Sequence, residues 1–417
     1  MRQENRPGVS RPRVSSEPDG WRATWRRIAM SSTLTTVLAI VVALVIGAIL
    51  IAAADPGVQQ SIGYLFAQPG DFFSALEHSI GNAYRELLRG AVFNWGAGVA
   101  PVARFTITQS IAYSVPLVFA GLALSVGFRA GLFNIGAQGQ ILLGATFCGY
   151  IGFAVPLPAG VHIVACVLAA FAGGALWGFI PGILKAKTGA NEVIVTIMLN
   201  SVAGFLLGYL LSLKAFQKPG ANTPISPLLL PTAKFPHFFS TPVDLGFVLA
   251  MAAAVGVWWM MERSTLGFRI RAVGENPEAA RAAGMNVAMS YVWVMVISGG
   301  LAGLAAMSQL MSTPVQTLNG QVASTFGFDA ITVALLGRSK PLGTVLAGLL
   351  FGGLRAGGYI MQATTGTPID IVLVLQAVIV LLIAAPPLVR SIFRLPDPER
   401  RKRTPKMRRD QPKEVTA

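Results

Sequence analysis

Charged residues are scarce in this sequence. Of its 417 residues only 12% are Asp, Glu, Lys or Arg, whereas 53% are hydrophobic, and the mean hydropathy is +0.60. Soluble domains typically carry about twice that share of charge. The scarcity argues against a soluble globular protein and favours an all-α polytopic membrane protein.

The chain also has few of the residues that catalytic and metal sites need. Its three histidines are scattered without metal-ligand spacing, and its two cysteines, Cys148 and Cys166, lie in apolar runs where a structural disulfide is not expected. No Gly-Lys dipeptide occurs, which excludes a phosphate-binding GxxxxGK[ST] loop. We therefore expect no metal, no cofactor and no catalytic residue in this chain. If ATP drives its function, ATP and Mg²⁺ are expected on a separate chain.

The net charge of +15 is concentrated in two tails. Residues 1–30 carry seven arginines against three acidic residues, and residues 390–417 carry ten Lys or Arg against four. Basic tails that flank apolar spans stay on the cytoplasmic side and attract anionic lipid headgroups. We expect membrane lipids rather than nucleic acid as their partners, with both termini in the cytoplasm.

Between the tails, residues 31–389 form a predicted transmembrane domain with about ten spans. The eighth is short enough to be half-buried or re-entrant. Ten spans place every short basic turn on the cytoplasmic side, in agreement with the tails. The predicted spans are 33–54, 107–126, 135–154, 162–184, 193–213, 245–261, 288–311, 326–336, 342–361 and 369–388.

The segments between spans add detail. The outer segment 55–106 contains an amphipathic pattern at 71–88, with Asp71 placed to cap its start and Gly90 to end it. The outer loop 214–244 carries six prolines, and 262–287 is the longest cytoplasmic loop. A short echo between 174–189 and 348–366, in opposite orientations, suggests an inverted repeat.

The most informative stretch is 128–144, FRAGLFNIGAQGQILLG. Three glycines lie close to Asn134, Gln138 and Gln140. Unpaired amides are unfavourable in hydrocarbon, so these side chains must face protein or water. One interpretation is a broken helix start beside a polar pathway, and the other is a glycine-rich turn whose amides cap helix ends.

A second polar group opens the fifth span. Asn191 can cap this helix and Glu192 suits its positive end. Alternatively, Glu192 and Asn200 face a central pathway. Phe133 could stack on a base, although packing is the commoner role of a lone phenylalanine. The predicted pathway residues are Phe133, Asn134, Gln138, Gln140, Glu192 and Asn200.

The cytoplasmic loop contains signals for a short helix at 277–283. Asn276 suits the N-cap, Pro277 the first helical position and Gly284 the C′ position. Four alanines give the helix a small surface, and so short a helix needs external packing. It is either an ordinary surface helix or a contact for a partner.

Three motifs in order, GLFNIGAQGQ (131–140), GANEVIVTIMLN (189–200) and RAVGENPEAARAAGM (271–285), resemble permease subunits of ABC importers. The resemblance covers about 101–387 and is closest to the nucleoside and simple-sugar branch. The chain departs from the family at Gln138, where Glu is usual.

The resemblance implies an importer for a nucleoside or, alternatively, a simple sugar such as a pentose. It implies three partners: a cytoplasmic ABC ATPase, a second related permease and an extracytoplasmic substrate-binding lipoprotein of the basic-membrane-protein type. The helix at 277–283 would be the coupling helix that enters a cleft of the ATPase. The residues implied in coupling are Arg271, Gly274, Glu275, Asn276, Pro277, Ala279, Ala280 and Gly284.

Two other classes are less well supported. An ion-coupled secondary transporter should carry titratable residues inside the membrane, and Glu192, Asp329 and Asp370 all lie near predicted span ends. A membrane enzyme should show a catalytic cluster, and the sequence shows no such pattern.

Overall fold

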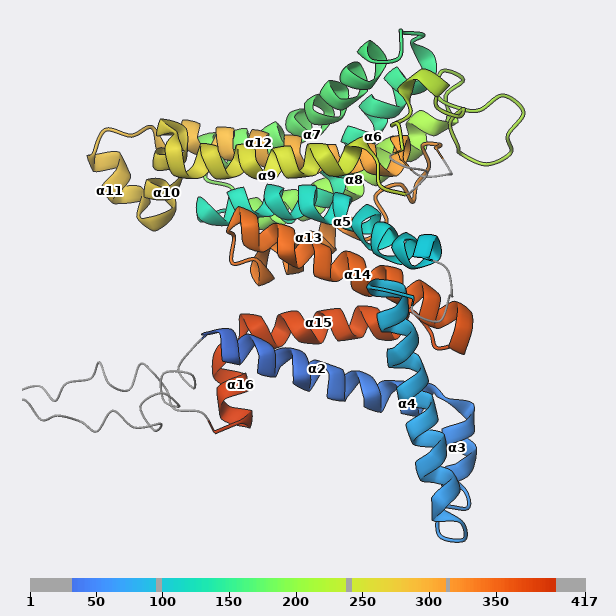
Figure 1. Ribbon diagram of the computed structural model, residues 1–417. Helices are drawn as coiled ribbons and strands as arrows, with labels where there is room; N and C mark the ends of the chain where they lie inside the picture. Colours follow the sequence, from blue (N-terminus) through green and yellow to red (C-terminus); the bar gives the residue numbers. More distant parts are fainter. Residues whose placement is uncertain (1–31, 95–99, 238–241, 313–315, 395–417) are drawn as a thin grey trace, which may run out of the picture.

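The computed structural model describes residues 32–94, 100–237, 242–312 and 316–394, and its regular elements are helices (Figure 1). This confirms the all-α prediction. The basic tails at 1–30 and 395–417 lie outside the described residues. The helices are α2 Ser32–Ala54, α3 Pro56–Ile62, α4 Pro69–Ala91, α5 Ala100–Arg129, α6 Ala137–Ala154, α7 Val161–Thr188, α8 Glu192–Ser212, η1 Pro231–Ala233, α9 Leu245–Arg263, α10 Thr265–Glu275, α11 Pro277–Ala282, α12 Val287–Met311, α13 Phe326–Leu336, α14 Pro341–Thr365, α15 Asp370–Ala384 and α16 Pro386–Ile392.

Nine of the ten predicted spans each correspond to one helix, and the tenth is divided between α15 and α16. Seven are long and apolar enough to cross a membrane, namely those in α2, α5, α7, α8, α9, α12 and α14. The α6 helix has 18 residues but carries Gln138 and Gln140 in its first turn. The 11-residue α13 and the 15-residue α15 are shorter. At 1.5 Å per residue α13 is roughly 16 Å long, about half of a hydrocarbon core, so it cannot cross alone.

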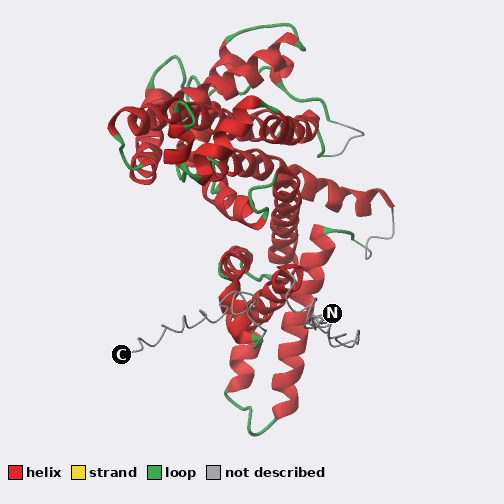
Figure 2. Ribbon diagram, turned by 90° about the vertical axis from the view of Figure 1, so that its left-hand side faces the viewer, coloured by secondary structure: helices red, strands yellow, loops and turns green. Residues whose placement is uncertain are grey.

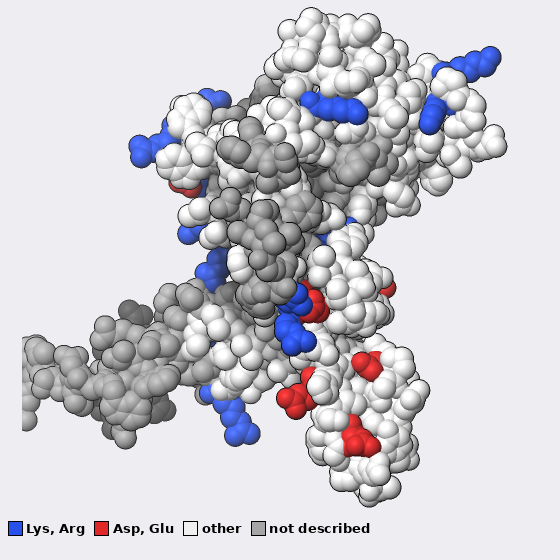
Figure 3. All heavy atoms as spheres, turned by 45° about the vertical axis from the view of Figure 1, so that its right-hand side comes forward, with Lys and Arg blue, Asp and Glu red and all other residues white. Residues whose placement is uncertain are grey.

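The described helices form a large bundle and a smaller lobe. The bundle contains α5–α9 and α12–α14, while α2 packs against α15, α4 and α16. The start of α2 and the α16 helix lie at the same end of the molecule as α10 and α11, and the α3–α4 hairpin projects from the other end (Figure 1). Figure 2 views the molecule from the end that carries α10 and α11. On the face seen in Figure 3, acidic atoms gather on this hairpin, and much of the bundle surface is uncharged.

Glycines set the central helix packing. The α7 and α12 helices cross with their backbones in contact, because a Cβ added at Gly303 would lie 2.2 Å from the Ala170 carbonyl oxygen. A Cβ at Gly174 would lie 2.2 Å from the Gly299 oxygen. Only glycine permits such an approach, as the glycine-rich pattern of the fourth span predicts.

The packing also has the symmetry that the sequence echo suggests. The α7 helix packs on α12, and α14, its counterpart, packs on α5. Both α7 and α14 end in a threonine followed by a left-handed glycine, Gly189 at φ +69° and Gly366 at φ +70°. The units α5–α8 and α12–α15 thus share one pattern of contacts.

Three boundaries differ from prediction. Pro69 lies in the first turn of α4 and Gln68 is its N-cap, so Asp71 lies inside the first turn without being the cap. Gly90 does not end α4, because it packs against the backbone of α14, where an added Cβ would lie 2.8 Å from the Gly357 Cα. The last span breaks into α15 and α16, since the prolines that begin α16 cannot donate to the preceding turn.

Candidate functional site

The α5–α6 link, residues 130–136, folds back into the bundle. Gly131 adopts a left-handed conformation at φ +71°, and the Leu132 N–H donates to the Gly127 carbonyl at 3.0 Å. The Asn134 Nδ2 then donates to Ser298 Oγ at 2.8 Å, near the middle of α12. The α6 helix therefore begins deep in the bundle, and a polar pathway beside it stays a prediction.

Asn134 and Gln140 form a closed hydrogen-bond cluster with Ser298. Asn134 Nδ2 donates to Gln140 Oε1 at 2.9 Å, Gln140 Nε2 donates back to Asn134 Oδ1 at 3.2 Å, and Ser298 Oγ donates to the Ala123 carbonyl at 2.8 Å. Asn134 and Gln140 are 0% and 1% exposed. Asn134 Oδ1 also accepts from the Gly136 N–H at the start of α6. In this conformation both amides stabilise the link, and their role in a pathway stays a prediction.

Gln138 joins the start of α6 to the start of α13. Its Nε2 donates to the Ser324 carbonyl at 2.7 Å, and its Oε1 accepts from the Gly327 N–H at 3.0 Å. An ionised carboxylate at this position could accept from Gly327 but could not donate to Ser324. Glutamine, in place of the glutamate that is usual in the resembling family, therefore suits both of these partners.

The other predicted pathway residues lie around the same link. Asn200 of α8 accepts from the Gly139 N–H at 2.8 Å and donates to the Ile135 carbonyl at 2.9 Å. Glu192 forms an ion pair with Lys185 at 2.8 Å. Phe133 is 54% exposed, and its ring centroid lies 5.2 Å from that of Phe128. Among the six predicted residues, Phe133 alone has a mostly exposed side chain.

The structure adds a charged pair that the sequence reasoning missed. Arg355 lies in the middle of α14, and its Nη1 is 3.4 Å from Asp329 Oδ2 in the first turn of α13. Its Nη2 donates to Ser324 Oγ at 3.1 Å, and its guanidinium lies 4.6 Å from the Phe326 ring centroid. The signal in the sequence was an arginine inside an otherwise uncharged span.

The helix predicted at 277–283 lies in the loop 262–287, which we call the coupling loop after its predicted role, and it has the predicted caps. Asn276 Oδ1 accepts from the N–H groups of Glu278 and Ala279, both at 3.0 Å. Gly284 is left-handed at φ +81°, and the Met285 N–H donates to the Ala280 carbonyl at 3.0 Å, which is a Schellman ending. The α11 helix ends at Ala282, one residue before the prediction.

One predicted coupling residue is buried inside the loop, and its part in coupling stays a prediction. Ala280 is 4% exposed and packs in a buried cluster with Val273 and Val287. It therefore supports the loop from inside instead of presenting a contact surface. The exposed small residues of this segment are Ala279, Ala282 and Ala283.

The coupling loop packs directly on the α5–α6 link. A Cβ at Gly274 would lie 2.2 Å from the Arg129 carbonyl oxygen, and a Cβ at Gly131 would lie 3.4 Å from the Gly274 oxygen. Glu262 at the end of α9 binds Arg129 at 3.5 Å and Arg271 at 2.7 Å. The α10 helix and the α5–α6 link are thus in direct backbone contact, and Glu262 joins both through ion pairs.

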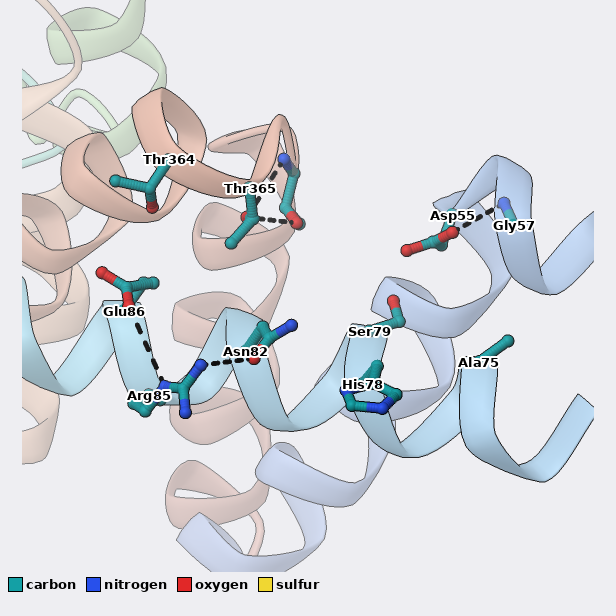
Figure 4. Close-up of a pocket in the computed structure, with 11 residues that line it drawn as sticks. Asp55, Gly57, Ala75, His78, Ser79, Asn82, Arg85, Glu86, Thr364 and Thr365 are labelled. Carbon is teal, nitrogen blue, oxygen red and sulfur yellow. Dashed lines mark hydrogen bonds and ion pairs between the residues drawn. The ribbon is translucent and has the colours of Figure 1, made fainter. Parts of the chain in front are cut away.

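A polar cavity of about 490 Å³ lies at the end opposite α10 and α11. Hydrogen bonding from Ser79 lowers the pKa of Asp55 at its rim. Figure 4 shows α4 side chains facing the Asp55 turn and the end of α14. Its lining includes Asp55, His78, Ser79, Asn82, Arg85, Glu86, Thr364 and Thr365.

Comparisons with known proteins place these features in a transport family. The profile of the branched-chain amino acid transport system permease component family matches residues 106–384. No solved structure matches the chain. The guanosine ABC transporter permease protein NupP of Bacillus subtilis (strain 168) is 39% identical over 293 residues, covering 69% of this chain and 84% of that protein.

Two further relatives have different named substrates. The glucose ABC transporter permease protein TsgB13 of Haloferax volcanii is 35% identical over 290 residues, covering 67% of this chain and 76% of its own. The nucleoside ABC transporter permease protein NupB of Lactococcus lactis subsp. cremoris is 34% identical over 289 residues, covering 67% and 79%.

Proposed function

This chain belongs to the family of branched-chain amino acid transport system permease components, and we propose that it is the nucleoside-translocating permease of an ATP-driven importer. The family match begins at residue 106, so α2–α4 lie outside it. ABC permease membership argues against the ion-coupled and enzymatic alternatives. Translocation changes no bond in the solute.

The substrate is inferred from the relatives. The guanosine and nucleoside permeases match at 39% and 34% identity, and the glucose permease matches at 35%. Two of the three names favour a nucleoside, as does the resemblance of the motifs to the nucleoside branch. A sugar, such as a pentose, is the second candidate because of the glucose relative.

The contact between the coupling loop and the α5–α6 link carries the mechanistic part of the proposal. A cytoplasmic ATPase would hold the exposed alanines of α11. Its closure would push α10 against the link through Gly274, where no side chain intervenes. Because the link positions both the amide cluster and the start of α6, this push would rearrange the bundle centre.

The other assignments follow from this function. The α11 end would face the cytoplasm together with both termini, and the α3–α4 end would face an extracytoplasmic binding lipoprotein. A second permease would complete the pathway. ATP and Mg²⁺ would bind the ATPase chain.

Uptake measurements test the proposal. Cells that carry the whole importer are given labelled nucleosides and, separately, labelled pentoses, and uptake is compared with that of cells lacking this permease. We expect permease-dependent uptake of nucleosides. Uptake of pentoses without nucleosides would refute the substrate, and equal uptake in both strains would refute the transport function.

A further inference from the structure

One face of α13 carries three polar residues beside the exposed Phe328 and Leu335, and the described residues of this chain leave it partly uncovered. Thr325 and Phe328 are exposed, and Asp329 and Thr332 are half-buried on the same side. Phe328 is 49% exposed. These positions recur at helical spacing, so they form one stripe. The Thr325 and Thr332 hydroxyls donate within this segment, to the Asp329 carboxylate and the Asp329 carbonyl. The carboxylate itself would be strongly unfavourable in lipid, so we expect the stripe to face water or protein.

The charged pair beside this stripe remains accessible. The Arg355 and Asp329 side chains are 13% and 24% exposed, and their closest atoms are 3.4 Å apart. Thr325 Oγ1 donates to the same carboxylate oxygen at 2.8 Å. Arg–carboxylate pairs are frequently shorter and bidentate, whereas this pair has a single contact. This pair is instead held at the edge of the stripe by Ser324 and the Phe326 ring.

An aromatic surface lies one helical turn away. Tyr359 follows Arg355 by four residues on α14 and is 43% exposed. Its ring is stacked on Tyr113 of α5, with centroids 5.5 Å apart and an interplanar angle of 30°. One turn corresponds to about 6 Å along the helix, which is comparable with the distance between a base and its ribose.

We propose that these side chains bind the translocated nucleoside, an inference that depends on the proposed function. The site comprises Thr325, Asp329 and Thr332 of α13, Arg355 and Tyr359 of α14, and Tyr113 of α5. The Asp329 carboxylate accepts hydrogen bonds from the two vicinal ribose hydroxyls, since an ionised carboxylate is an acceptor with two oxygens. Arg355 holds the carboxylate in place through their ion pair. Tyr359 offers its exposed face to the base.

The site predicts a specific discrimination. A 2′,3′-dideoxynucleoside lacks both hydroxyls, so it cannot satisfy the carboxylate. Uptake by the whole importer is measured for a labelled ribonucleoside and for its 2′,3′-dideoxy analogue, with the binding protein at saturation. The ratio of the two rates is then compared between wild type and variants. Any discrimination by the binding protein is common to all variants and cancels in this comparison.

Three variants are informative. Asp329→Asn should lower the ratio about tenfold, the loss expected for charge-assisted hydrogen bonds. The double variant D329R/R355D retains an ion pair but moves the carboxylate to α14, so it should reach the membrane and still lose discrimination. Glu77→Gln, an exposed carboxyl on α4, is the matched control and should leave the ratio unchanged.

The outcomes distinguish a pair that binds the nucleoside from a pair that is only structural. An unchanged ratio in D329N, or a swapped pair that recovers both uptake and ratio, would show that the pair is only structural and would overturn the site. Loss of the ratio in the assembled double variant supports the site even if D329N fails to reach the membrane. Absence of all nucleoside uptake in wild type would instead contradict the proposed function.

Discussion

Substitution of Gly274 by alanine tests whether the coupling loop acts through the α5–α6 link. The added Cβ would lie 2.2 Å from the Arg129 carbonyl oxygen and 3.0 Å from the Ala130 backbone, whereas ordinary contacts begin at 3.4 Å. Both neighbours are backbone atoms and cannot rotate away. The α10 helix must therefore separate from the end of α5 by a distance on the order of 1 Å.

The magnitude of the effect follows from this overlap. Overpacking of a tight contact typically destabilises it by about 1–3 kcal/mol. If this free energy destabilises the state in which the coupling loop is docked on the α5–α6 link, the population of that state decreases about 5- to 150-fold. The folded bundle should persist, because its main core lies between other helices, such as α7 and α12.

The assay is the number of nucleosides transported per ATP hydrolysed by the purified importer. We expect G274A to retain ATP hydrolysis and to transport at least about fivefold fewer nucleosides per ATP. Gly256→Ala in α9 is the control, since a Cβ there meets nothing within 4 Å. Wild-type stoichiometry in G274A would refute transmission through this contact.

Three further predictions follow from the packing. Ala282→Arg should weaken co-purification of the ATPase while the loop stays resistant to protease. Ala280→Arg should make the loop sensitive to protease, because it places a charge at a buried position. Equal protease resistance of the two variants would contradict the orientation of α11. Gly303→Val should remove the protein from the membrane fraction, whereas Gly208→Val, where an added Cβ meets nothing within 4 Å, should leave its amount unchanged. Immunoblots of membranes measure both amounts. Burial raises the pKa of Asp244, so the charged form opposes folding at neutral pH. Asp244→Asn should raise the melting temperature at pH 7, with a gain that shrinks as falling pH protonates the wild-type carboxyl; a constant difference would contradict this assignment.

Local signals predicted much of the fold. The apolar run at 326–336 coincides with α13, and the Asn276 and Gly284 caps lie where their conformational preferences place them. These features depend on neighbouring residues in the chain, so a sequence pattern specifies them. The glycines of the fourth span predicted close packing for the same reason, although not the identity of the partner helix α12.

The site was harder to predict because its contacts join distant parts of the chain. Gln138 meets Ser324, and Asn134 meets Ser298, across separations of more than 160 residues. The sequence shows that these amides need partners, but not whether water, solute or protein supplies them. Arg355 and Asp329 lie on different helices, so neither residue alone indicated an ion pair.

Accumulation of nucleoside in sealed vesicles tests the central claim most directly. The importer is reconstituted with its ATPase and binding protein, and ATP is supplied either on the face that carries α11 or on the opposite face. We expect labelled nucleoside to accumulate on the α11 side, and only when ATP and the ATPase are on that side. Accumulation without the ATPase, or driven by ATP supplied only on the opposite side, would contradict it.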